Sequence, residues 1–171
     1  MNKTRVWAIV VSCMFAFGSC AWSQGMKAGL WETTSTMTWQ QSPFQEMNLP
    51  PAATQALGGG THSVQVCVTQ EQIDKFGTVP PQIGHQCQLT DLNITASGMT
   101  ANLTCSGQMN GSGTVTASWA DSSHSTGKVH FAGTMQMGPN SAPVEWITEW
   151  SSVYKSADCG SVKPAPMPAS Q

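Results

Sequence analysis

Charged residues are scarce in this sequence. The 171 residues include seven Lys and Arg and nine Asp and Glu, about 9% of the chain, whereas average soluble domains carry roughly 25%. The formal net charge of −2 leaves no basic stripe that could displace counterions from a nucleic acid, so we expect no nucleic-acid partner. Because 40% of the residues are hydrophobic, disorder driven by charge repulsion is excluded as well. The surface must instead be built largely from the 19 Ser and 18 Thr.

Long hydrophobic runs are also missing, with one short exception near the start. Residues 6–17 are mostly apolar, but twelve residues are too few to cross a bilayer of about 30 Å as a helix. Lys3 and Arg5 precede this run, and residues 21–23 place small side chains at a cleavage site before Gln24. These features predict a secretory signal peptide at residues 1–23.

Removal of this segment leaves five Lys, no Arg and all nine acids, for a net charge of −4. We therefore expect one exported domain at residues 24–160, located in the periplasm or secreted, with no membrane span in the mature chain. The alternative is a lipoprotein, because residues 17–20 form a degenerate lipobox in which Cys20 would be acylated.

The Cys-x-x-Cys motif is absent. Cys67, Cys87, Cys105 and Cys159 remain after the signal, and an even count in an exported chain predicts two disulfides. Of the three possible connectivities we favour Cys67–Cys87 with Cys105–Cys159, because the first closes a short loop and the second would hold the C-terminal strand. The spacings match no zinc module, so we expect no metal site and no cofactor.

Alternation of apolar and polar residues predicts a chain of β-strands. In residues 30–39, Trp31, Met37 and Trp39 share one face with small hydroxyl residues. Trp146 and Trp150 also fit a helical spacing, but the β-branched residues around them favour a strand. We expect about seven strands in an antiparallel meander, curled into a barrel or half-barrel, with a β-sandwich as the alternative. The predicted strands lie near residues 30–39, 64–68, 87–96, 99–105, 115–119, 129–137 and 144–154.

Three segments outside these strands have their own signals. Thr69 and Gln72 form a capping-box pattern, which predicts one short helix near residues 69–76 that ends at Gly77. Between the first two strands, residues 51–57 suit a short helical turn. Residues 161–171 are rich in proline, and we expect them to form a disordered tail.

Five stretches together resemble the bacterial exported family of unknown function numbered 3617. They are residues 29–32 (Gly-Leu-Trp-Glu), 67–69 (Cys-Val-Thr), Cys87, residues 104–107 (Thr-Cys-Ser-Gly) and residues 157–164, which end in Val-Lys-Pro. The resemblance extends over nearly all of residues 26–164. It implies a small periplasmic or secreted bacterial domain, and it brings no known catalytic residue, ligand or partner.

Catalytic motifs are missing from the chain. It contains no Gly-x-Ser-x-Gly elbow and no His-Glu-x-x-His pair. Glu145 and Glu149 lie four residues apart, but we expect them on a solvated strand face rather than in a catalytic pair. We likewise expect no ligand cluster among the four histidines, which are His62, His85, His124 and His130. We therefore expect no enzyme, and a hydrolase is a distant third among the functions considered.

Large apolar side chains are the most informative group. One interpretation is that they fill the core, and the other is that some line a pocket at a barrel mouth together with Met137. The second predicts a non-catalytic binding module for an apolar small molecule; the alternative function is a protein–protein interaction module of the envelope. The candidate binding residues are Trp31, Met37, Trp39, Trp119, Phe131, Met135, Trp146 and Trp150.

Overall fold

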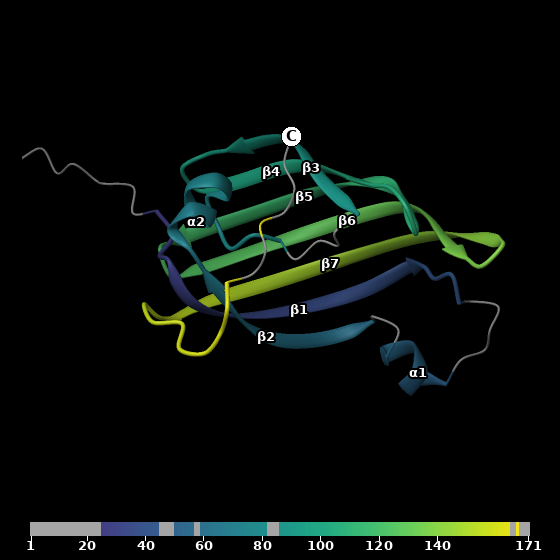
Figure 1. The fold of residues 1–171 in the computed structure, drawn as a ribbon, viewed down its shortest axis with the longest axis horizontal. Helices are drawn as coiled ribbons and strands as arrows, with labels where there is room; N and C mark the ends of the chain where they lie inside the picture. The colour runs from purple at the N-terminus through teal and green to yellow at the C-terminus, as the bar shows by residue number, and fades with distance from the viewer. Residues whose placement is uncertain (1–24, 45–49, 57–58, 82–85, 165–166, 168–171) are drawn as a thin grey trace, which may run out of the picture.

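The computed structural model describes residues 25–44, 50–56, 59–81, 86–164 and 167. Seven antiparallel strands form one curved sheet, and two short helices accompany it (Figure 1). The strands are β1 (Gly29–Gln41), β2 (Gly60–Val68), β3 (Cys87–Ile94), β4 (Gly98–Cys105), β5 (Met109–Asp121), β6 (His124–Met137) and β7 (Asn140–Ser156), and the helices are α1 (Pro51–Ala56) and α2 (Gln70–Phe76).

The order of strands across the sheet is β2-β1-β7-β6-β5-β4-β3. From β3 to β7 each strand pairs with the next, and the β1–β2 hairpin then joins the sheet through pairing of β1 with β7. β2 and β3 are the two edges, so the sheet curls without closing. The all-β half-barrel is therefore confirmed, and within the described residues no second sheet forms a sandwich.

Burial follows the alternation that the sequence predicts. In β4, Met99 and Leu103 are each 1% exposed, and the residues between the buried positions face solvent. In β5, Val115 is fully buried on the same face. We call this face, which also carries Phe131 and Trp150, the inner face. Removal of these apolar side chains from water is the main contribution to stability.

Glycines allow the inner face to curve closely over its aromatic side chains. Gly127 on β6 is paired with Trp150 on β7, and a Cβ atom on Gly127 would collide with the indole ring. A Cβ on Gly113 would collide with the backbone of the neighbouring strand β6. Glycine residues at such close contacts allow a sheet to bend.

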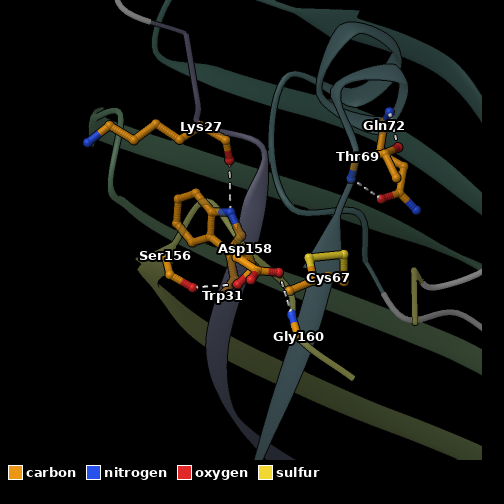
Figure 2. Close-up of a disulfide and its surroundings, with 9 residues drawn as sticks. Lys27, Trp31, Cys67, Thr69, Gln72, Ser156, Asp158 and Gly160 are labelled. Carbon is orange, nitrogen blue, oxygen red and sulfur yellow. Dashed lines mark hydrogen bonds between the residues drawn. A yellow bond between two sulfur atoms is a disulfide. The ribbon is translucent and has the colours of Figure 1, made fainter. Parts of the chain in front are cut away.

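Helix α2 begins at the predicted capping box, which Figure 2 shows, and ends at Gly77 as expected. The Thr69 hydroxyl accepts a hydrogen bond from the Gln72 backbone N–H at 3.2 Å, and the Gln72 amide oxygen accepts one from the Thr69 N–H at 2.8 Å. Gly77 ends the helix in the left-handed conformation at φ 72°. Ile73 and Phe76 are buried, so α2 packs with the core of the domain. Helix α1 falls on the helical turn expected at residues 51–57.

The disulfide pairing differs from the one we favoured. The structure joins Cys67 to Cys159 and Cys87 to Cys105, so the prediction of Cys67–Cys87 with Cys105–Cys159 was wrong. Cys87 and Cys105 are directly opposite each other in the β3–β4 pairing. Cys67 lies on β2, the opposite edge strand, where the chain that follows β7 reaches it. The favoured Cys67–Cys87 pair does not form because β2 and β3 are opposite edges of the sheet, whereas Cys87 and Cys105, which are even closer in the sequence, face each other in one hairpin.

The described part of the C-terminal segment lies against the domain. Beyond the Cys67–Cys159 bond, the Gly160 N–H donates to the Asp158 carboxylate at 2.8 Å (Figure 2), and Pro164 forms a bridge with Cys67. Met167 packs against the core cluster. Pro164 and Met167 belong to the segment 161–171 that we expected to be a disordered tail, and residues 165–166 and 168–171 of that segment lie outside the described residues.

The predicted signal peptide at residues 1–23 and the alternative lipid attachment at Cys20 lie outside the described residues. Within the described part of the chain, neither helix has the length and apolar character needed to cross a membrane.

Candidate ligand-binding cavity

A cavity of about 750 Å³ lies over the inner face of the sheet. Strands β1, β2 and β7 contribute the largest share of its lining, and β2 is the edge strand among them. Val79, Pro80 and Pro81, from the connection between α2 and β3, contribute from outside the sheet. All three are buried. The β2–β3 connection and the sheet therefore enclose the cavity together.

Five of the eight candidate residues line this cavity. They come from three neighbouring strands, β1, β7 and β6, which explains why local alternation placed them on a common face. Trp39 and Trp146 are directly paired between β1 and β7, and the remaining indole, Trp150, is 9% exposed. The five residues are Met37, Trp39, Met135, Trp146 and Trp150.

Three candidates are core residues instead. Trp31 is fully buried, and its indole N–H donates to the Lys27 carbonyl at 2.9 Å (Figure 2). Trp119 is 8% exposed and donates to the Ala96 carbonyl at 2.9 Å. Phe131 is fully buried and stacks on Trp146 with ring centroids 5.4 Å apart, so it supports the cavity wall without lining it.

Met137, which the sequence placed on the same strand face as Met135, is half-buried and does not line the cavity.

Several lining residues were not among the eight candidates. Thr33 and Ser35 share the face of Met37, so the alternating pattern of β1 already indicated their position. Pro80 and Pro81 indicated only an extended loop. Lys163, the one charged residue of the described lining, lies in the segment that we expected to be a disordered tail, so no local pattern could have placed it.

The lining is apolar with a few hydroxyl groups. Thr33 is buried, and its hydroxyl is 2.8 Å from the Ser152 hydroxyl, so its polar group is already satisfied within the sheet. No His, Asp or Glu side chain lines the cavity in the described residues, and Cys87 is oxidised in a disulfide. This arrangement suits an apolar ligand held by shape and a small number of polar contacts.

Acidic side chains and histidines of the described residues lie outside the cavity lining. His130 Nε2 and Glu145 Oε1 lie 2.8 Å apart in a hydrogen bond, while Lys128 pairs with Glu149 at 3.4 Å, so the two acids contact different partners. None of these four side chains lines the cavity.

At the β5–β6 turn, Asp121 lies 2.9 Å from His124. Hydrogen bonds from the Ser123 backbone N–H and then from His124 lower the pKa of the Asp121 carboxyl. Among the described residues, no three His, Cys, Asp or Glu side chains gather closely enough to hold a metal ion.

Comparison with known proteins identifies a family without adding a function. No curated protein and no solved structure matches the chain. The model of the family described as protein of unknown function (DUF3617) matches residues 26–159, which include all seven strands and the four disulfide-bonded cysteines. Because this match covers most of the sequence, the chain belongs to the DUF3617 family.

Proposed function

We propose that this protein is a non-catalytic binding module for an apolar small molecule. The observation that carries the proposal is the cavity of about 750 Å³, walled by Trp39, Trp146, Trp150 and three methionines. Small-molecule sites in proteins typically measure about 300–1,000 Å³ and are lined mainly by apolar and aromatic residues. Methionine side chains add adaptability, which suits apolar ligands of varied shape.

The chemistry of the lining supports a role without catalysis. General acid–base catalysis needs a titratable side chain within hydrogen-bonding reach of the reacting group. The described lining offers hydroxyls, one amide and a single titratable group, the Lys163 amine, and it sets no carboxylate, imidazole or free thiol beside that amine. His130 and Glu145, which form a hydrogen bond with each other, do not line the cavity.

The proposed place of action is outside the cytoplasm. The two disulfides indicate an oxidising compartment. We propose that the chain is exported to the periplasm or secreted after removal of residues 1–23, with anchoring through an acylated Cys20 as the alternative. The mass of the exported protein tests this, because a chain that begins at Gln24 differs from an acylated one.

A pair of variants on β1 tests the binding function. Ser35 lines the cavity, whereas Thr38 is exposed on the other face of the same strand. Ser35→Phe fills cavity space, so we expect at least a tenfold loss of affinity, about 1.4 kcal/mol, for the neutral dye N-phenylnaphthylamine. Thr38→Phe should leave the affinity unchanged. Tryptophan fluorescence and dye emission are the measurements; a wild-type protein that shows no saturable binding would refute the proposal.

One observation favours a second function, the envelope interaction module. β2 is an edge strand, and residues 61–65 are exposed, with Val64 at 49%. Such an edge can accept an extended segment of another protein as an additional strand. The same two β1 variants distinguish the functions, because pairing at the β2 edge does not depend on cavity space and should survive Ser35→Phe.

A further inference from the structure

Lys163 is the one charged side chain among the described residues that line the cavity. The chain has only five lysines after residue 23. The other four each contact an acid, a hydroxyl or an aromatic ring, and Lys163 has no ion pair with a described residue. Lys27 contacts Ser123 and the Tyr154 ring, Lys75 lies over Phe76, Lys128 pairs with Glu149, and Lys155 pairs with Glu32.

The backbone at Lys163 is held beside β2. The Cys67–Cys159 disulfide fixes the chain four residues earlier, and Pro164 forms a bridge with the same Cys67. A covalent bond on one side and a backbone contact on the other thus define where the lysine emerges. Because this segment is already ordered, a ligand that contacts the ammonium group does not have to order the backbone.

The polarity of the lining changes from one side of the sheet to the other. Every described lining residue from β3 to β6 is apolar: Cys87, Leu103, Met109, Val129 and Met135. The uncharged polar residues come from β1, β2 and β7, and they are Thr33, Ser35, Gln65 and Thr148. The exposed lining residues, Val64, Gln65 and Lys163, belong to β2 and to the segment bridged to it. The β2 side is therefore the solvent-exposed, positively charged end of the cavity.

From the Lys163 ammonium, its fixed backbone and the change in polarity across the lining, we infer that the ligand is a single-chain amphiphile with an anionic head group. The head group lies at the Lys163 ammonium, and the apolar chain extends toward Met109 and Met135. This inference rests on the proposed binding function and specifies its ligand class. A fatty-acid carboxylate and the phosphate of a single-chain lipid share this chemistry.

Probes with one chain length and different head groups test the inference on the full exported chain with both disulfides formed. We expect dodecanoate and dodecyl phosphate to bind more tightly than dodecanol, and dodecyltrimethylammonium to bind most weakly. The tighter of the two anions indicates the source of the head group. Lys163→Met should weaken dodecanoate binding about fivefold, which is the upper end for a solvent-exposed ion pair, and should leave dodecanol binding unchanged. Tryptophan fluorescence titrations below the micelle concentration provide the affinities.

Lys155→Met is the matched control, because Lys155 is an exposed lysine that pairs with Glu32 and does not line the cavity. Equal affinities for dodecanoate and dodecanol, or equal effects of the Lys163 and Lys155 variants, would overturn the assignment of the head group while apolar binding stands. Failure of every probe to bind would overturn the binding function as well.

Discussion

Residue 127 is a glycine, and the absence of a Cβ atom there leaves room for the Trp150 indole in the cavity wall. The indole ring lies over Gly127, where any Cβ atom would collide with it. Gly127→Ala should therefore displace the ring and lower the free energy of unfolding by about 1–3 kcal/mol, the usual cost of overpacking. Urea unfolding measures the loss, and a changed tryptophan emission in the folded state reports the displaced indole.

Gly25→Ala is the control for this substitution, since a Cβ at Gly25 meets no atom within 4 Å and the residue has no unusual φ. We expect it to change the free energy of unfolding by less than about 0.5 kcal/mol. If both alanine variants unfold at the wild-type urea concentration, then the contact between Gly127 and Trp150 does not constrain the wall.

At the scale of elements, α2 is the part whose formation depends most directly on a local signal. Thr69→Ala removes the hydroxyl that accepts from the Gln72 N–H, so we expect a loss of about 1 kcal/mol in the free energy of unfolding. Gln70→Ala, on the exposed side of the same helix, should cost less than about 0.5 kcal/mol. Thermal unfolding of the two variants compares them; equal midpoints would contradict a role for the cap.

The individual elements could be predicted because their signals are local. Alternation within β1 and β4 identifies the buried face, and Thr69 with Gln72 marks the start of α2. The pairing of β1 with β7 has no such signal, because Trp39 and Trp146 are far apart in the sequence and meet only in the folded sheet. For the same reason, local patterns could predict the cavity residues that lie on strands, but not those that the α2–β3 connection and the C-terminal segment contribute.

At the scale of the whole molecule, the open sheet requires something to connect its two edges. The chain passes from β2 to β3 through α2, and this crossing segment supplies Val79 to the cavity. Each disulfide stabilises one edge: Cys67–Cys159 ties β2 to the C-terminal segment, and Cys87–Cys105 ties β3 to β4. The favoured Cys67–Cys87 pairing was wrong because local sequence patterns do not show that β2 and β3 lie at opposite edges of the sheet.

The two disulfides should therefore differ in what their loss does. The Cys67–Cys159 bond spans 92 residues and Cys87–Cys105 spans 18, so the loop-entropy model gives losses of about 4–5 and about 3 kcal/mol. Replacing both cysteines of the first pair with Ala also frees the segment that carries Lys163, so the preference for dodecanoate over dodecanol should disappear. Replacing the second pair should leave that preference intact. Urea unfolding and probe titrations measure both effects, and a preference that survives without Cys67–Cys159 would mean that β2 and Pro164 hold Lys163 without the covalent bond.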